Sequence, residues 1–178
     1  MPSIDETLLE EKSAAEVISS DCQGTSCQEL TSFGWARIEA GVTTDSAELA
    51  SGLRIQDDGH YTDVGDGTCL SYEVVGGPKN LRMLVENGVI TTIEAYHDAK
   101  EPVFRTDQGV KLGDPESAVR DKYKSLKQLP DIYSEPPDKK LFYYEPGGER
   151  GIKFHINGVK VSGISVGTQS IEYVEGCL

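Results

Sequence analysis

The stretches LRMLVENGVITTI at residues 81–93 and GIKFHINGVKVSGI at residues 151–164 decide the fold of this chain. Each places an Asn-Gly pair between two runs that are rich in aliphatic residues. Asn-Gly is the preferred pair in two-residue β-hairpin turns, because a type I′ turn needs positive φ at both central positions. Both stretches are therefore predicted to form β-hairpins, with Asn87-Gly88 and Asn157-Gly158 as the turns.

The two hairpins belong to a longer pattern that occurs twice. Three further pairs of segments match on the N-terminal side, at offsets of 71 or 72 residues. They are residues 38–41 with 110–113, residues 70–73 with 142–145, and Gly76-Gly77 with Gly147-Gly148. Matches in the same order at a nearly constant offset indicate a tandem duplication.

Each unit is predicted to hold a short strand, a helix and an antiparallel β-meander. The expected fold class is α+β, with two tandem repeats in which a short helix packs on the meander. The expected boundaries are an N-terminal helix or tail over residues 1–34, a first repeat over 35–105 and a second over 106–178. Residues 3–19 match an amphipathic helix with Ser3 and Glu6 as a capping box, and a frayed acidic tail is the alternative.

Charge limits the possible partners. The 178 residues include 30 acidic and 17 basic side chains, a net charge of -13. Such a chain repels phosphate backbones and anionic membrane surfaces, so nucleic acid is not an expected partner. The excess lies in residues 1–105, while residues 106–178 carry 11 acids and 10 bases. A protein with a basic surface is the expected partner, and solubility alone also accounts for the charge.

The four cysteines bear on the compartment. Cys22, Cys27, Cys69 and Cys177 form no metal-binding pattern, which favours disulfides over four buried thiols. Of the three possible pairings we favour Cys22 with Cys27 and Cys69 with Cys177. No apolar run is long enough to span a bilayer. The expected location is therefore periplasmic or secreted, with a leader removed from the chain as given.

The predicted order of elements, a strand, a helix after a glycine and a β-meander, occurs twice in the chain. This tandem order resembles the layout of the β-lactamase inhibitory protein and of small outer-membrane lipoproteins of the barrel-assembly machinery. The resemblance covers about residues 35–176 and rests on Gly41, Gly113 and the two Asn-Gly hairpins. GVKLGDPESAVRDKY at 109–123 and the ending YVEGC at 173–177 also look like uncharacterised bacterial exported proteins. The resemblance implies an extracytoplasmic module whose sheet faces bind another protein. It transfers no inhibitory contact residue.

The sequence gives little indication of catalysis. H-E-x-x-H does not occur, and the histidines His60, His97 and His155 lie in no known motif. G-x-S-x-G occurs once, as GISVG at residues 163–167, and a match to this short pattern alone does not assign a nucleophile. His155 is predicted to be a half-buried structural residue. No catalytic residue, cofactor or metal ligand is therefore assigned, and the chain is expected not to be an enzyme.

The segment DDGHYTDVGDG at residues 57–67 is the strongest candidate for a contact loop. Its spacing does not fill the positions of an EF-hand, so metal binding is a minor alternative beside a plain solvated loop. An acidic loop with an aromatic ring can also steer toward a basic cleft and bury the ring there. Tyr143 and Tyr144 face opposite sides of a strand, so they cannot both lie in the core: one is either an exposed binding anchor or a tyrosine with a buried ring and a hydrated hydroxyl. The predicted partner-binding residues are Asp57, Asp58, His60, Tyr61, Asp63, Asp66, Tyr143 and Tyr144.

Two functional hypotheses follow from these features. The first is a non-enzymatic exported protein-binding module, an inhibitor or immunity protein that blocks a basic enzyme such as a cell-wall hydrolase or a toxin. The second is a structural or assembly module of the envelope, similar to the lipoproteins.

Overall fold

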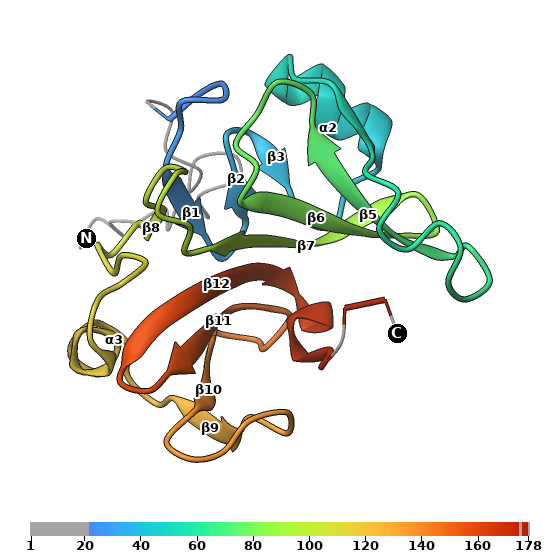
Figure 1. The fold of residues 1–178 in the computed structure, drawn as a ribbon. Helices are drawn as coiled ribbons and strands as arrows, with labels where there is room; N and C mark the ends of the chain where they lie inside the picture. Colours follow the sequence, from blue (N-terminus) through green and yellow to red (C-terminus); the bar gives the residue numbers. More distant parts are fainter. Residues whose placement is uncertain (1–21, 175, 178) are drawn as a thin grey trace, which may run out of the picture.

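The computed structural model describes residues 22–174, 176 and 177 of the chain. The helix predicted over residues 3–19 lies outside the described residues. In the described part, two α-helices and a short 3-10 helix accompany two β-sheets, so the fold is α+β and mostly β (Figure 1). None of these helices is long and apolar enough to cross a membrane.

The larger sheet has eight strands in the order β4-β5-β6-β7-β12-β11-β10-β9, each antiparallel to its neighbours. Its strands are β4 (Ile55–Asp57), β5 (Cys69–Val74), β6 (Leu81–Glu86), β7 (Val89–Tyr96), β9 (Lys127–Pro130), β10 (Lys139–Tyr144), β11 (Arg150–Asn157) and β12 (Lys160–Thr168). The strands β7 and β12 pair at its centre, where Glu94 lies opposite Ser165. The last strand of each half of the chain therefore forms the seam between the halves.

A smaller sheet and the helices complete the fold. The smaller sheet has the order β3-β2-β1-β8, and β1 runs parallel to β8. Its strands are β1 (Glu29–Thr31), β2 (Gly34–Trp35), β3 (Ile38–Glu39) and β8 (Arg105–Thr106), and the helices are α2 (Thr44–Ser51), α3 (Glu116–Lys122) and the 3-10 helix η1 (Gln169–Glu172). Thr43 is the N-cap of α2, and its hydroxyl accepts a hydrogen bond from the Ser46 amide. Threonine is a preferred N-cap residue for this reason.

The first predicted hairpin is confirmed and the second differs by one residue. Glu86 pairs with Val89, so Asn87 and Gly88 form the turn, with φ of 50° and 80°. In the second hairpin Asn157 pairs with Lys160, which leaves Gly158 and Val159 in the turn. Only Gly158 needs positive φ there, and glycine adopts it without strain. A β-bulge lies in each hairpin, after Leu84 and after His155.

One hydrophobic core joins residues of both halves. Strand residues such as Met83, Ile93, Phe154 and Val166 are buried against the smaller sheet and the helices. Trp35 is fully buried in this core, edge-on to Phe104 at 6.5 Å, and its indole nitrogen donates a hydrogen bond to the Cys27 carbonyl. We call the sheet face that carries these residues the core face.

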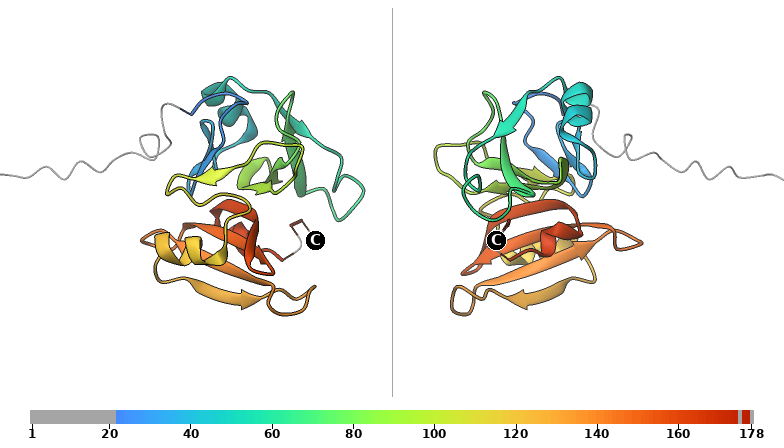
Figure 2. Two further views of the ribbon diagram at one scale, coloured as in Figure 1. Left: turned by 60° about the vertical axis from the view of Figure 1, so that its left-hand side comes forward. Right: turned by 90° about the vertical axis from the view of Figure 1, so that its right-hand side faces the viewer.

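The C-terminal segment, which comprises η1 and the described residues 173, 174, 176 and 177, returns to the first half of the chain. Figure 2 shows the C-terminal end at the boundary between the first half, blue to green, and the second half, orange to red. A disulfide joins Cys69 on β5 to Cys177, and a second joins Cys22 to Cys27. This is the pairing that the sequence favours. The C-terminal segment is thereby fixed over the sheet face opposite the core face, which we call the second face.

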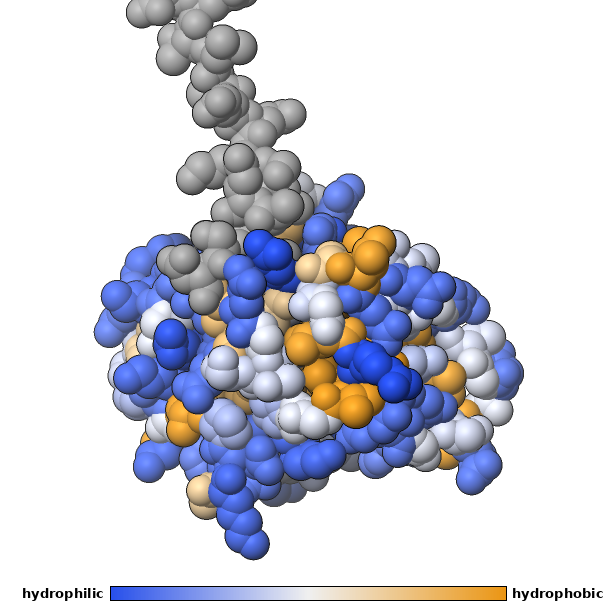
Figure 3. All heavy atoms as spheres, turned by 90° about the horizontal axis from the view of Figure 1, so that it is seen from above, coloured by the Kyte–Doolittle hydropathy of each residue, from blue (hydrophilic) through white to orange (hydrophobic). Residues whose placement is uncertain are grey.

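The face of the molecule around α2 is mostly hydrophilic. Viewed from above, its apolar residues lie in a small central area (Figure 3). Leu49 on α2 is 89% exposed.

Candidate functional site

The centre of the second face carries an unusual number of buried charges. Side chains directly opposite each other on neighbouring strands share a sheet face. The pairs Arg82–Glu94, Glu94–Ser165, Ser165–Lys153 and His155–Lys140 therefore place one network across strands β6, β7, β12, β11 and β10. Glu94, Lys140 and Lys153 are all buried.

Glu94 is the hub of this network. The Arg82 Nε lies 3.2 Å from its Oε2, and the Tyr96 hydroxyl donates to the same oxygen at 2.6 Å. The Ser165 hydroxyl donates to its Oε1 at 3.3 Å. Burial opposes the charge, but Tyr96, Lys153 and Arg82 outweigh it and hold the pKa of Glu94 below its usual value. The carboxylate is thus ionised and fully partnered.

The same environment lowers the pKa of two neighbouring basic side chains, Lys153 and His155. Burial lowers the pKa of Lys153 to about 8, and the Lys153 ammonium donates to the Tyr173 carbonyl at 3.1 Å. Burial and the nearby Lys153 lower the pKa of His155 to about 3, so its imidazole is neutral at pH 7. His155 is half-buried and contacts the Ser165 hydroxyl through Nε2 at 3.1 Å, in agreement with its predicted structural role.

This network is not arranged as a catalytic triad. In a triad the histidine lies between the carboxylate and the nucleophile. Here Ser165 lies between Glu94 and His155, and the serine is fully buried. The arrangement orients side chains inside the sheet and offers no reachable nucleophile.

The C-terminal segment covers part of the second face. The helix η1 packs over β7, β11 and β12. The hydroxyls of Ser170 and Tyr173 donate to the two oxygens of Glu86, at 2.6 and 2.7 Å, and the Tyr144 hydroxyl donates to Glu172. Together with the disulfide from Cys177 to Cys69, these contacts attach Ser170, Glu172 and Tyr173 to the second face.

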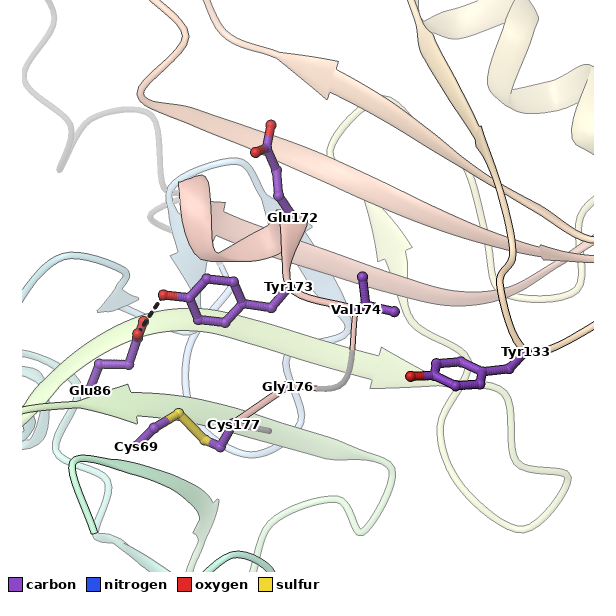
Figure 4. Close-up of a pocket in the computed structure, with 8 residues that line it drawn as sticks. All are labelled: Cys69, Glu86, Tyr133, Glu172, Tyr173, Val174, Gly176 and Cys177. Atoms are coloured by element: carbon purple, nitrogen blue, oxygen red, sulfur yellow. Dashed lines mark hydrogen bonds between the residues drawn. A yellow bond between two sulfur atoms is a disulfide. The ribbon is translucent and has the colours of Figure 1, made fainter. Parts of the chain in front are cut away.

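Two adjoining hollows lie beside this segment, and we call them together the C-terminal groove. The first has a volume of about 500 Å³, and Figure 4 shows Tyr133 on one side of it with Tyr173 and the disulfide on the other. Its lining residues are Cys69, Glu86, Tyr133, Glu172, Tyr173, Val174, Gly176 and Cys177. The second has a volume of about 820 Å³, shares Glu172 and Tyr173 with the first, and adds Glu149, Thr168, Gln169 and Ser170.

The groove combines exposed apolar side chains with negative charge. Tyr133, Tyr173 and Val174 are 64%, 41% and 48% exposed. Burial opposes the charge of Glu86, but hydrogen bonds led by Ser170 and Tyr173 outweigh it and lower the pKa of this carboxyl. Among the described residues, no lysine, arginine or histidine nitrogen lies within 4.0 Å of Glu86. Glu86 is thus an ionised side chain held by hydroxyls alone.

The predicted acidic loop is partly organised by its own hydrogen bonds. Asp57 accepts from the Gly59 amide and the Thr62 hydroxyl, Asp58 from the His60 amide and the Ser71 hydroxyl, and Asp66 from Thr68. Asp58, His60, Asp63 and Asp66 are exposed, so they remain available to a partner. No group of three or more His, Cys, Asp or Glu within the described ranges is placed to hold a metal ion.

Tyr61 needs a correction. The hypothesis uses its ring as an exposed docking anchor, but the residue is only 6% exposed. A Cβ at Gly176 would lie 2.6 Å from the Tyr61 hydroxyl oxygen, so the ring packs directly on the C-terminal segment. The Tyr61 ring therefore packs under the C-terminal segment, which the Cys69–Cys177 disulfide holds, and is not an exposed anchor.

Tyr143 and Tyr144 face opposite sides of β10, as strand geometry requires. Tyr143 packs against the core, with its ring 4.9 Å from that of Tyr123. Tyr144 lies on the second face, where its hydroxyl is bonded to Glu172. It positions the rim of the groove, and the exposed tyrosines of the groove itself are Tyr133 and Tyr173.

The residues that line the groove were not among the predicted contacts. Glu86 directly precedes the Asn-Gly turn, and a charged residue at the end of a strand does not by itself indicate a functional site. Tyr133 lies in a long polar loop. One signal was available: the favoured pairing of Cys69 with Cys177 brings residues 172–177 to β5. The charged network was hidden because Glu94 and Ser165 are 71 residues apart.

Comparisons with known proteins give little further information. No protein-family model and no curated protein matches the chain. Among solved structures, the chain is similar to the uncharacterized protein yfeY from Escherichia coli, with 17% sequence identity and a TM-score of 0.47. The match covers 78% of this chain and 99% of that chain. A likeness of this size supports no inference about activity.

Proposed function

We propose that the chain is a non-enzymatic exported module that binds a basic protein in the C-terminal groove. Its partner is a basic enzyme, such as a cell-wall hydrolase or a toxin, which the module blocks as an inhibitor or immunity protein. The observation that carries the proposal is Glu86, an ionised carboxylate without a cationic partner among the described residues, in a groove lined by exposed tyrosines.

Side-chain chemistry supports a protein as the occupant. Tyrosines dominate many protein interfaces, because a ring gives a large contact area at low entropic cost and a hydroxyl that stays hydrated. Tyr133, Tyr173 and Val174 supply such an area beside the carboxylates of Glu86 and Glu172. The groove therefore has apolar anchoring positions at its centre and charge at its border.

The charge of the whole chain supports a basic partner. A net charge of -13 accelerates encounter with a cationic surface, and salt weakens this effect. The exposed Asp58, Asp63 and Asp66 add to this field from the loop that supports the groove.

Exported location and tandem duplication form part of the same proposal. Disulfides persist in oxidising compartments, and the chain has two of them. The order of the larger sheet runs from β4 to β7 in one half and from β9 to β12 in the other, with the last strands paired. A duplicated unit that pairs through its final strand accounts for this order.

Capture of a partner tests the proposal. The oxidised full chain, immobilised, is incubated with periplasmic extract and culture fluid at about 50 mM salt and then eluted with rising salt. We expect a basic protein that elutes as salt increases and that is lost when Tyr133 and Val174 are both replaced by alanine. A chain with the Leu49→Ala substitution on α2 serves as the control for removing an exposed apolar residue. Failure to capture any basic protein, or equal capture by the groove variant, would contradict the proposal.

A further inference from the structure

Lys140 is a buried member of the second-face network that lacks a partner in the described part of the chain. It is only 9% exposed. Among the described residues, none accepts a hydrogen bond from its ammonium or lies within ion-pair distance of it. The described buried polar side-chain atoms without a partner belong to Asn80, Thr92 and Tyr123, so the Lys140 nitrogen is not fully enclosed. The ammonium therefore remains accessible to a small ligand.

The register of the sheet places Lys140 beside a second lysine. Lys140 lies opposite His155 on β11 and opposite Leu129 on β9, so these side chains share the second face. Lys153 lies two positions before His155 on β11 and is therefore a diagonal neighbour of Lys140 on the same face. Leu129 is itself exposed, so solvent reaches the edge of the sheet beside Lys140.

The charges of this network do not balance. Arg82, Lys140 and Lys153 carry three positive charges, whereas Glu94 carries one negative charge. The oxygens of Glu94 are already bonded to Arg82 and to two hydroxyls. Buried charges are costly unless they are paired, so the positive excess favours an anion from outside the described part of the chain.

Two neighbouring side chains respond to the same positive charge. Burial lowers the pKa of Lys153 to about 8, and Lys140 adds to the lowering. Burial and Lys153 lower the pKa of His155 to about 3. Lys140 contributes to that lowering as well, and the acids Glu94 and Asp131 offset only part of it. A negative charge added at Lys140 would relieve both basic groups.

We propose that the second face holds a site for one small oxyanion, a carboxylate or a phosphate, bound directly by Lys140 and attracted by the charge of Lys153. A lysine ammonium has three donors, and those of Lys140 have no acceptor among the described residues. Charge-assisted hydrogen bonds are strong where water is partly excluded. Neither lysine lines the C-terminal groove, so this site is additional to the proposed contact with a basic protein.

Other ways of satisfying Lys140 are less consistent with its surroundings. A cationic ligand would meet the ammonium groups of both lysines. Asp131 is a nearby acid, but its Oδ1 accepts a hydrogen bond from the Tyr133 amide, and no ion pair with Lys140 forms between these described residues. Water hydrates an ammonium but does not offset its charge in a buried environment.

Lysine NMR tests the site directly. The oxidised full chain is labelled with ¹³C-lysine, and the Cε signal of Lys153 is followed from about pH 6.5 to about pH 10 in chloride, acetate and phosphate at equal ionic strength. An anion that binds the protonated form of Lys153 about tenfold more tightly raises the pKa of this lysine by up to about one unit. We expect a saturable rise with acetate or phosphate and not with chloride. The more effective probe identifies the ligand group as a carboxylate or a phosphate.

Lysine variants locate the effect at Lys140. Lys140→Met removes the charge and keeps an unbranched apolar stem, and we expect it to weaken the bound probe at least about tenfold. In chloride alone the same variant is expected to raise the pKa of Lys153, because Lys140 lowers it in the wild type. Lys140→Arg retains the charge and is expected to retain binding. Lys122→Met removes one exposed charge on α3 and is the matched control.

Two results would overturn the assignment. The first is the same pKa of Lys153 in chloride, acetate and phosphate, which would show that no oxyanion binds beside it. The second is an effect of acetate or phosphate that persists unchanged in Lys140→Met. The titration of the wild type and of Lys140→Arg decides the first result without Lys140→Met, so the test remains decisive if that variant does not fold.

Discussion

At the residue scale, the second face shows how a sheet holds several charges away from water. Unpaired buried charges are strongly destabilising, so they require partners. Glu94 has Arg82, Tyr96 and Ser165, and His155 avoids the cost by remaining neutral. Lys153 keeps a carbonyl partner from the C-terminal segment. The network therefore couples the sheet to the segment that forms the groove.

His155 makes stability depend on pH. Its pKa is about 3 in the folded chain, against about 6.5 for an unfolded histidine, so the unfolded state binds the extra proton between these values. Stability must then fall as pH drops through this window. Glu86 and Glu94 have pKa values below the unfolded value of 4.5. Their protonation therefore reduces the stability of the folded chain further only as the pH falls below about 4.5.

We expect the free energy of unfolding to fall by up to about 2 kcal/mol between pH 7 and pH 5, and His155→Gln to remove most of this slope. Urea unfolding at a series of pH values measures it. His60→Gln, at an exposed position in the acidic loop, is the control and keeps the slope. An unchanged slope in His155→Gln would show that the imidazole is not held neutral by the fold.

At the element scale, the two disulfides have different expected effects. Cys69 and Cys177 close a loop across 108 residues, whereas Cys22 and Cys27 are five residues apart. In the chain-entropy treatment, a closed loop of this length stabilises by about 5 kcal/mol and the short one by about 2 kcal/mol. The long bond also holds the wall of the groove.

Replacing each pair by serine separates these contributions. We expect Cys69→Ser with Cys177→Ser to lose about 2 to 3 kcal/mol more than Cys22→Ser with Cys27→Ser, as measured by urea unfolding of the two double variants. The first variant is also expected to expose the amides of η1 and Tyr173 to hydrogen exchange. Equal losses, or a larger loss from the short bond, would contradict the role of the C-terminal segment as a structural element of the groove.

Local signals in the sequence predicted turns and strand faces well, but they predicted strand register and the packing around each element less well. Asn87-Gly88 gave the first turn correctly because its φ requirement is local. The second turn moved to Gly158 and Val159 because the pairing of β11 with β12, including the bulge after His155, sets the register. Likewise, alternation placed Tyr143 and Tyr144 on opposite faces, but only the fold shows that the acidic loop buries Tyr61 under the C-terminal segment.

At the scale of the whole molecule, the fold joins its halves through one core and one seam. The pairing of β7 with β12 makes a continuous sheet, and the buried residues on its core face come from both halves. The second face of the same sheet, with the C-terminal segment over it, carries the groove. Because a disulfide and the hydrogen bonds to Glu86 hold the lining side chains, we expect a partner that enters the groove to meet them already in position, which lowers the entropic cost of binding.

The central claim is that a basic partner docks in the C-terminal groove. Hydrogen–deuterium exchange of the oxidised chain, alone and with the captured partner, locates the contact most directly. We expect new protection at residues 131–135 and at 170–177, with no change at α2, where Leu49 is also exposed. Protection confined to α2, or an unchanged groove in the complex, would contradict the account.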